Sequence, residues 1–361
     1  MGRTWNDYEM LGWYCGKAVA KLMNKAKNVK LMEGKNNIRT LDLFAGVGGI
    51  RLGFENAGFK TVFANDFDKT CKETYDLNFN EPKLNTEDIW KLNMKELPEF
   101  DMLCAGFPCQ AFSIAGYRRG FIDEKGRGNL FFRIAEILEL RKPRAFFLEN
   151  VKNLKTHDKG RTFKVIKETL ENLGYSVKAE VLNSMTHGGI PQNRERIFIV
   201  GFLDKEESER FVFPKETQLK VSFKEFVKDS ADSKYYYNDK PLFNRIKDDV
   251  NSEHTVYQWR RRYVRANKKG VVPALTANMG TGGHNVPIIK NGVGIRKLTP
   301  KECFLLQGFP KNFMLPELAD TKLYHQAGNS VTVPVVERIA KNISAVLEGK
   351  RLSPQIEITT Y

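Results

Sequence analysis

Short apolar stretches alternate with amphipathic ones along this chain, and their order predicts the fold. Six stretches have the apolar or alternating pattern of strands: 38–44, 61–64, 102–105, 145–148, 175–181 and 197–202. Three stretches between them carry apolar residues at helical spacing: 50–54, 130–138 and 163–173. Because strands and helices alternate from residue 38 to residue 202, we expect an α/β fold, a doubly wound and mostly parallel sheet with helices on both faces.

The pattern changes after residue 205, where the chain becomes mainly polar. Regular structure returns with a capping box at 299–302, a tight polar turn at 326–330 and a last helix over 336–346. We therefore expect a second, smaller domain between two sections of the first. The predicted parts are a basic extension 1–37, the α/β block 38–205, the smaller domain 206–295, a return segment 296–347 that completes the α/β block, and a tail 348–361.

Charge changes this picture by indicating the kind of partner. The chain has 58 Lys and Arg residues against 43 Asp and Glu residues, a formal net charge of +15. Such a surplus predicts a polyanionic partner, although a generally basic surface would also produce it. The extension 1–37 has apolar residues at helical spacing with lysines on an adjoining face, so it is either a surface helix or an accessory contact to nucleic acid.

Cysteine usage and hydropathy indicate the compartment. The five cysteines are scattered and form no Cys-x-x-Cys pair, which argues against a disulfide framework and against a zinc site. The sequence has no run of about 18 apolar residues and no secretory signal pattern. We expect a cytoplasmic protein without a bound metal and without membrane contact.

A glycine-rich turn follows the first predicted strand. It spans residues 44–49 (FAGVGG), and the second strand runs into Asp66, twenty positions after Gly46. Glycines let a ligand approach the backbone at a helix N-terminus, and doubly wound folds place a carboxylate at about this distance to bind a ribose. Arg51 stands where the dinucleotide fingerprint has its third glycine. A nucleoside without pyrophosphate is therefore the expected ligand, and a nicotinamide oxidoreductase is disfavoured.

A candidate nucleophile follows the third predicted strand. Gly106 ends that strand, and Pro108 fixes the backbone just before Cys109. The thiol is therefore either a presented nucleophile or a buried space-filler. A candidate acid, Glu149, stands at the end of the strand 145–148.

A basic and aromatic stretch, 256–270, lies within the predicted smaller domain. It contains six basic residues, no acidic residue and interleaved aromatic residues. Basic groups neutralise phosphates and aromatic faces stack on bases, so the stretch predicts a nucleic-acid contact. The alternative is a basic face that is merely solvated.

Together, these motifs resemble the cytosine carbon-5 DNA methyltransferases of bacterial restriction-modification systems. The matching stretches occur in the family's order: 42–49 (DLFAGVGG), 106–110 (GFPCQ), 149–151 (ENV), 192–196 (QNRER), 298–310 (LTPKECFLLQGFP) and 328–331 (GNSV). The resemblance covers about residues 39–205 and 296–347. In that family the variable stretch between the two blocks is a target-recognition domain, and here it contains the stretch 256–270.

The resemblance implies S-adenosylmethionine as the cofactor. Asp66 would hold its ribose, Asp88 and Ile89 would meet its adenine, and Phe67 takes a position that a larger, stacking aromatic often fills. From its own context Asp88 is equally well a cap before Trp90. The other residues implied at the cofactor are Phe44, Gly46, Val47, Gly48, Gly49, Gly106, Pro108, Leu130, Asn329 and Ser330.

The resemblance also implies the chemistry. Cys109 would add to carbon 6 of a cytosine flipped out of double-stranded DNA, so that carbon 5 can accept the methyl group. Glu149 would bind nitrogen 3 and the amino group through a carboxyl of raised pKa, and Arg194 and Arg196 would hold the target nucleotide. The residues expected to contact DNA are Gln110, Ser113, Arg118, Arg119, Arg127, Arg260, Arg261, Arg262, Tyr263, Arg265, Thr276, Asn278, Gly282, Gly283 and His284.

Two other functions stay open at this point. A tRNA cytosine-5 methyltransferase would share the thiol chemistry, but the GFPCQ signature with a long basic insert favours DNA. A catalytically inactive DNA-binding homologue is disfavoured because Cys109, Glu149, Arg194 and Arg196 are all present. We expect a monomeric, sequence-specific DNA methyltransferase that is functionally paired with a restriction endonuclease.

Overall fold

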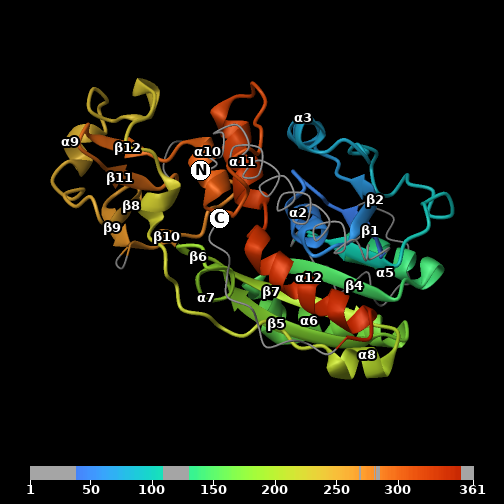
Figure 1. Ribbon diagram of the computed structural model, residues 1–361. Coiled ribbons are helices and arrows are strands. Elements are labelled where there is room, and N and C mark those ends of the chain that lie inside the picture. Colours follow the sequence, from blue (N-terminus) through green and yellow to red (C-terminus); the bar gives the residue numbers. More distant parts are fainter. Residues whose placement is uncertain (1–37, 109–129, 268–269, 280, 282–284, 351–361) are drawn as a thin grey trace, which may run out of the picture. The chain divides into compact units, whose positions relative to one another are not determined.

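The computed structural model describes residues 38–108, 130–267, 270–279, 281 and 285–350 (Figure 1). The predicted extension 1–37 and residues 351–361 of the predicted tail lie outside the described residues. No helix in the described part is both long enough and apolar enough to cross a membrane.

A six-stranded sheet with the spatial order β2-β1-β3-β4-β7-β5 organises the structure. Its strands are β1 (Arg39–Leu43), β2 (Lys60–Asn65), β3 (Met102–Ala105), β4 (Ala145–Val151), β5 (Ser176–Asn183) and β7 (Glu195–Phe202). Strand β7 runs antiparallel to both of its neighbours and the other pairs are parallel, so the mostly parallel sheet is confirmed. The chain moves from β1 to β2 on one side and returns as β3 on the other, which creates a topological switch point at the carboxyl ends of these strands.

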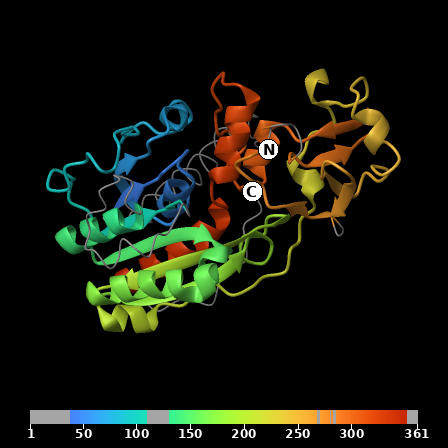
Figure 2. The ribbon, with the colours of Figure 1, turned by 180° about the vertical axis from the view of Figure 1, so that it is seen from behind.

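Helices cover both faces of this sheet (Figures 1 and 2). Successive strand residues point to opposite faces, so Met102 and Cys104 enter one apolar core while Leu103 and Ala105 enter the other. Helices α2 and α12 pack into the first core, and helices α5 and α6 pack into the second. The bounds of these four helices are α2 (Gly49–Asn56), α12 (Val333–Leu347), α5 (Leu130–Arg141) and α6 (Arg161–Asn172).

The return segment supplies three helices, α10 (Pro300–Leu305), α11 (Asp320–Asn329) and α12. The predicted capping box is confirmed, since the Thr299 hydroxyl accepts from the Glu302 amide and the Glu302 carboxylate accepts from the Thr299 amide. The predicted tight turn at 326–330 is wrong, because residues up to 329 are the last turn of α11. Leu323, Tyr324 and Ala327 are buried at helical spacing, a pattern that the polar residues around them concealed.

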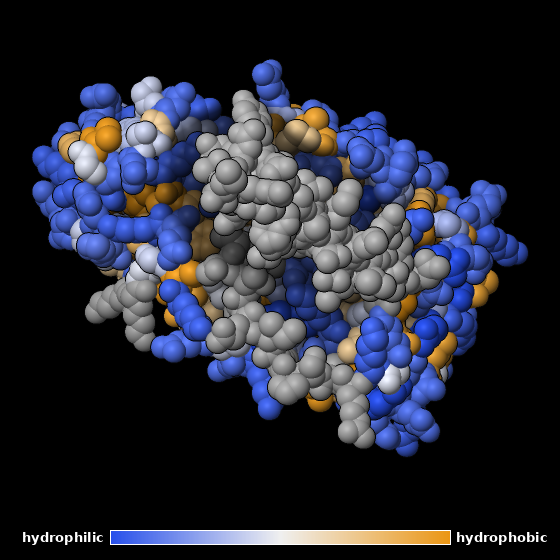
Figure 3. Space-filling view, in the orientation of Figure 1, coloured by the Kyte–Doolittle hydropathy of each residue, from blue (hydrophilic) through white to orange (hydrophobic). Residues whose placement is uncertain are grey.

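A four-stranded sheet, ordered β12-β11-β8-β9, is the largest regular unit in the described residues between 206 and 297. Every neighbouring pair in it is antiparallel. One of its faces covers a small core around Tyr257, and the side of this region in view in Figure 3 is mainly hydrophilic. Helix α9 (Phe243–Ile246) contributes to this core, and the strands of the sheet are β8 (Val256–Trp259), β9 (Val264–Asn267), β11 (Ile288–Lys290) and β12 (Ile295–Lys297).

Shorter elements connect the two regions. A two-stranded parallel pair joins β10 (Val272–Pro273) to β6 (Gln192–Asn193). Val256 and Met279 also belong to the same apolar core as Phe304 of α10, so residues of the predicted smaller domain share a core with the return segment. The remaining elements are α3 (Lys69–Asn78), α7 (Ser184–Gly188), α8 (Lys205–Arg210) and the 3-10 turns η1 (Lys152–Lys155), η2 (His157–Gly160), η3 (Phe223–Phe226) and η4 (Ser233–Tyr235).

Candidate functional site

The strands β1, β2, β3 and β4 end on one side of the sheet, which we call the carboxyl edge. Asp66, directly after β2, accepts hydrogen bonds from the amides of Gly46 (2.8 Å) and Asp68 (2.8 Å). These bonds fix the carboxylate beside the turn that follows β1. Burial raises the pKa of Asp66, and the two N–H donors oppose that rise. A carboxylate has about four acceptor positions, so each oxygen keeps one for a hydroxyl donor such as a ribose.

The glycines after β1 have different roles. A Cβ at Gly46 would find its nearest neighbour, Asp66 Oδ2, at 4.0 Å, so the space beside Gly46 is open. A Cβ at Gly48 would lie 2.3 Å from the Phe79 ring, and one at Gly49 would lie 2.6 Å from Ser330 Oγ. Gly46 therefore leaves room for a ligand, whereas Gly48 and Gly49 make room for other parts of the protein.

Phe67, next to Asp66, presents an aromatic ring that is 74% exposed. Two other residues predicted at the cofactor turn inward, since the side chains of Val47 and Ile89 lie in apolar cores. Asp88 caps a turn through its Oδ1, which accepts from the Trp90 amide at 3.0 Å. The capping interpretation of Asp88 is therefore confirmed, whereas the adenine contacts of Asp88 and Ile89 stay predictions.

The other residues predicted at the cofactor lie around the same edge. Phe44 begins the turn after β1 with a positive φ of 55°, and the half-buried Leu130 begins α5. Ser330 ends α11 against Gly49, which brings the far end of the chain to this turn. Asn329 is exposed, and its amide nitrogen lies 2.8 Å from His325 Nε2.

A buried acid lies at the end of β4. Arg196, which enters β7 beside it, forms an ion pair with Glu149, with 3.1 Å between Nε and Oε1. Burial raises the pKa of Glu149, while the charges of Arg196 and Arg194 act in the opposite direction. The direction of this pKa shift is the one that the sequence predicted for this acid, and the carboxyl lies beside a fixed positive charge.

The segment that leads to the predicted nucleophile is anchored to the same strand. A Cβ on Gly106 would lie 3.7 Å from Glu149 Oε2, so the chain passes close to the acid. The side-chain amide of Asn150 then donates to the Phe107 backbone carbonyl at 2.8 Å. Pro108 is the last residue described in this segment. The predicted residues that lie outside the described part are Cys109, Gln110, Ser113, Arg118, Arg119, Arg127, Gly282, Gly283 and His284.

Arg194 has a different place from the one that the sequence predicted. Its side chain is buried, and its guanidinium donates to the backbone carbonyls of Leu275 (2.5 Å), Gly328 (3.1 Å) and Ser330 (2.5 Å). These bonds use both terminal nitrogens on the protein itself. Arg194 therefore ties its own strand to the segments at 275 and 328–330, whereas the prediction had it holding the target nucleotide.

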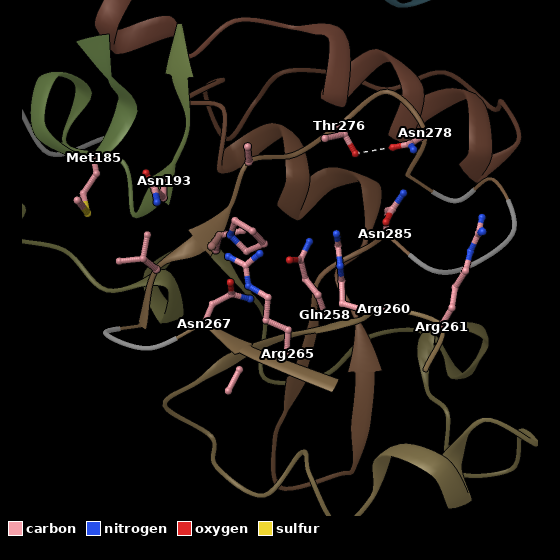
Figure 4. A pocket seen from close by; sticks show the side chains of 15 residues that line it. Met185, Asn193, Gln258, Arg260, Arg261, Arg265, Asn267, Thr276, Asn278 and Asn285 are labelled. Carbon is pink, nitrogen blue, oxygen red and sulfur yellow. Dashed lines mark hydrogen bonds between the residues drawn. The ribbon is translucent and has the colours of Figure 1, made fainter. Parts of the chain in front are cut away.

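A cavity of about 970 Å³ lies against the β8–β9 strand pair, which we call the ribbon (residues 256–267) (Figure 4). Met185 and Asn193 reach it from the α/β block, and Thr276 and Asn278 line it from the segment after β10. The labelled side chains around this space in Figure 4 are mostly amides and guanidinium groups. Such a lining suits a polar, negatively charged ligand.

Alternation along the ribbon explains this lining. Gln258 and Arg265 are directly opposed in the antiparallel register and both line the cavity. Tyr257 and Trp259 belong to the small apolar core of the four-stranded sheet. The Arg265 guanidinium has no hydrogen-bond or ion-pair partner among the described residues, so it is available to a ligand.

The predicted DNA-binding residues at the tip of the ribbon fall into two groups, those that line the cavity and those that do not. The Arg260 amide donates to the Tyr263 carbonyl, which closes a turn between β8 and β9. Arg260 and Arg261 line the cavity, whereas Arg262 and Tyr263 are exposed and do not.

Comparison with known proteins identifies the family of this chain. The family model for C-5 cytosine-specific DNA methylases matches residues 38–345. This protein belongs to that family. It is 53% identical over 311 residues to the type II methyltransferase M.Bsp6I of Bacillus sp., covering 85% of this chain and 98% of the relative. It is 41% identical over 326 residues to the type II methyltransferase M.SsoII of Shigella sonnei, covering 86% of this chain and 81% of the relative.

Solved structures agree on the fold of this methylase. The Dnmt2 methyltransferase of S. pombe matches with a TM-score of 0.67 and 20% identity, over 87% of this chain and 99% of that chain. The predicted assignment to the cytosine-5 DNA methyltransferases is thus confirmed, and the protein is an enzyme that methylates cytosine in DNA.

Some polar residues of the methylase were missed by sequence reasoning. Gln258, Asn267 and Asn285 line the cavity, yet amides in a polar region give no distinctive signal. Gln192 and Gln307 are buried and hydrogen-bonded to each other at 3.2 Å. Each lies in a matched motif, so their presence was visible, but the fact that they face each other depends on the fold.

Proposed function

We propose that this DNA methylase takes its methyl group from S-adenosylmethionine and acts, sequence-specifically, on a cytosine flipped out of double-stranded DNA. The observation that carries the proposal is the buried pair of Glu149 and Arg196, beside a chain segment that reaches Cys109 three residues after Gly106. A catalytic acid and a nucleophile would thus meet at one edge of the sheet.

The residues around the switch point fit the proposed cofactor. The open space at Gly46, the half-buried carboxylate of Asp66 and the exposed ring of Phe67 offer room, a ribose acceptor and an aromatic surface for adenine. When bound, S-adenosylmethionine supplies the methyl group that carbon 5 of the cytosine receives.

The chain's own residues supply the rest of the chemistry. The Cys109 thiolate would form a bond to carbon 6, and the electrons of the ring's carbon 5–carbon 6 double bond then make carbon 5 nucleophilic. A protonated Glu149 donates a hydrogen bond to nitrogen 3, and Arg196 holds that carboxyl in place. After methyl transfer, water takes the proton from carbon 5, and the electrons of that bond re-form the carbon 5–carbon 6 double bond and expel the Cys109 thiolate, which restores the aromatic ring.

We propose that DNA occupies the cavity beside the ribbon. The cavity is lined by Arg260, Arg265 and neighbouring amides, groups that pair with phosphates and with base edges. Residues 206–295 would then be the target-recognition domain, and the other residues of the α/β fold the catalytic domain.

The proposed chemistry is tested with a duplex that contains 5-fluorocytosine, because fluorine blocks the elimination step. We expect an adduct that resists denaturation with the intact protein and none with Cys109→Ser. Bisulfite sequencing of DNA from expressing cells identifies the target beforehand. Absence of an adduct on that mapped target contradicts the covalent step.

The nucleic-acid substrate is tested separately with labelled S-adenosylmethionine. We expect label in duplex DNA and none in tRNA; label in tRNA alone would contradict the proposal.

We further propose that the enzyme works as a monomer in a bacterial cytoplasm, paired with a restriction endonuclease. The names of its type II relatives support that pairing, which predicts that DNA it has methylated resists the partner endonuclease.

A further inference from the structure

The buried side chains of the stretch 192–194 connect the two ligand-facing parts of the molecule. The Arg194 guanidinium holds the Leu275 carbonyl, and the Gln192 side-chain oxygen accepts from the Leu275 amide at 3.0 Å. Both backbone groups of Leu275 are thus satisfied by side chains of the α/β block. Thr276 and Asn278, which line the cavity, follow at once, and their side chains are hydrogen-bonded to each other (Figure 4).

The same guanidinium reaches the other side. It holds the carbonyls of Gly328 and Ser330, and Ser330 lies against Gly49 of the turn after β1. One planar group therefore bridges the segment 275–278, which faces the cavity, and the segment 328–330, which faces the cofactor turn. A guanidinium presents its donors in a rigid fork, so the three carbonyls are held in a fixed arrangement.

Close packing makes this junction stiff. A Cβ on Gly328 would lie 2.2 Å from the Thr276 carbonyl carbon, so the two segments are in direct backbone contact. Gln307 extends the junction, since its side-chain nitrogen donates to the Ala327 carbonyl at 2.7 Å and its side-chain oxygen accepts from Thr332 at 3.1 Å. An interior packed in this way transmits displacement from one side to the other.

We propose that Arg194 is a positioning residue that couples the two sites, so that cofactor binding at the 328–330 side and DNA binding at the 275–278 side strengthen each other. The proposal rests on the proposed function, which assigns the two ligands. A ligand that orders one segment lowers the entropic cost of ordering the other. Because linkage is reciprocal, the same factor must appear whichever ligand is added first.

The experiment measures this coupling factor with the full-length protein. The probes are S-adenosylhomocysteine, which cannot donate a methyl group, and a duplex that carries the mapped target. The Kd of the duplex is measured with and without saturating S-adenosylhomocysteine. For the intact enzyme we expect a ratio of about 5 to 150, the usual range of coupling between sites. For Arg194→Lys we expect a ratio near 1, because an ammonium group cannot span all three carbonyls.

Arg296→Lys is the matched control. Arg296 is also fully buried, but its guanidinium holds the Glu302 carboxylate and the Lys228 carbonyl. Its substitution should reduce thermal stability and leave the coupling ratio unchanged. A wild-type ratio in Arg194→Lys, or an equal loss in Arg296→Lys, overturns the proposal.

If Arg194→Lys does not fold, hydrogen exchange of the intact enzyme tests the coupling between the two sites. S-adenosylhomocysteine alone should slow amide exchange in 272–279, where Leu275 and Met279 have hydrogen-bonded amides, as well as in 44–49. Peptides from 288–297 should not change. If S-adenosylhomocysteine protects the amides of 44–49 but not those of 272–279, the coupling is overturned and the proposed function stays intact. If the enzyme binds neither S-adenosylhomocysteine nor the duplex, the proposed function itself is contradicted.

Discussion

The carboxyl edge of the six-stranded sheet and the polar face of the ribbon hold their functional side chains in opposite ways. At the edge, Glu149 is buried and paired with Arg196, and Asp66 is held by two backbone amides. On the ribbon, Arg260 and Arg265 are exposed, and their guanidinium groups have no partner among the described residues. Catalysis requires groups fixed before the substrate arrives, whereas DNA binding exchanges water and ions for phosphates and bases. Substitutions at the edge should therefore change kcat, and substitutions on the ribbon should change DNA affinity.

The largest effect is expected at Glu149. Glutamine has the same shape but cannot hold or return a proton, and it removes the partner charge of Arg196. We expect Glu149→Gln to lower the single-turnover rate of methyl transfer by about 10²- to 10⁴-fold. Binding of S-adenosylhomocysteine should be unchanged, because Asp66 and not Glu149 faces the cofactor turn. Equal losses in rate and in cofactor affinity would mean that the edge is not organised as described.

The pH profile of Glu149 sharpens the same comparison. Burial raises the pKa of this acid, so the protonated form extends to higher pH than for a free glutamate and is lost as the pH rises through the shifted value. The Cys109 thiolate has the opposite dependence, with a free thiol pKa of about 8.5. We expect a bell-shaped rate profile whose alkaline limb disappears in Glu149→Gln. An alkaline limb that persists in the variant would assign the acid to another group.

Packing provides the next contrast, between Gly48 at the edge and Gly270 on the ribbon side. Both glycines have a positive φ, of 84° and 60° respectively. Alanine should cost about 1–2 kcal/mol of unfolding free energy at either site through backbone strain. At Gly48 the added Cβ would also lie 2.3 Å from the Phe79 ring, while at Gly270 the nearest atom is 3.6 Å away. Gly48→Ala should therefore lose a further 1–3 kcal/mol or so from overpacking, as measured by urea unfolding. Equal losses would show that the edge is no more tightly packed than the ribbon side.

Much of the edge could be predicted from the sequence, because parallel strands bring their carboxyl ends together whatever their distance in the chain. Asp66 and Glu149 follow apolar runs, so their place at the edge follows from strand order and the switch point. The role of Arg194 could not be predicted in this way. Its three partners are backbone carbonyls at 275, 328 and 330, and a carbonyl has no signature in the sequence.

The side chains of the ribbon that face the cavity could not be predicted, for another reason. A basic and aromatic run indicates a nucleic-acid contact, but which of its arginines face a ligand depends on the strand register. The turn at 260–263 sets that register, opposing Gln258 to Arg265. Amides such as Gln258 and Asn267 enter the cavity because of it, although nothing in their local sequence marks them.

A smaller effect than those at the edge is expected at Arg265, which lines the cavity without a partner among the described residues. Arg265→Ala should raise the Kd of the mapped duplex by about 5- to 150-fold, the range for losing one good contact between a side chain and a base. The rate at saturating DNA should be unchanged. Arg245→Ala is the control, since Arg245 is exposed on α9 and does not line the cavity. A fall in the saturating rate would place Arg265 with the catalytic groups and break the comparison.

The smallest effect is expected at Arg262, on the exposed turn of the ribbon and outside the cavity. If DNA occupies the cavity as proposed, a guanidinium in that place meets the DNA backbone and not the base edges. Arg262→Ala should weaken cognate and non-cognate duplexes alike and reduce the slope of log Kd against log salt by about 1. Arg265→Ala should instead weaken the cognate duplex more than the non-cognate one. If Arg262→Ala changes which sequences are methylated, as read by bisulfite sequencing, the tip takes part in base recognition and the boundary between the two groups of arginines lies elsewhere.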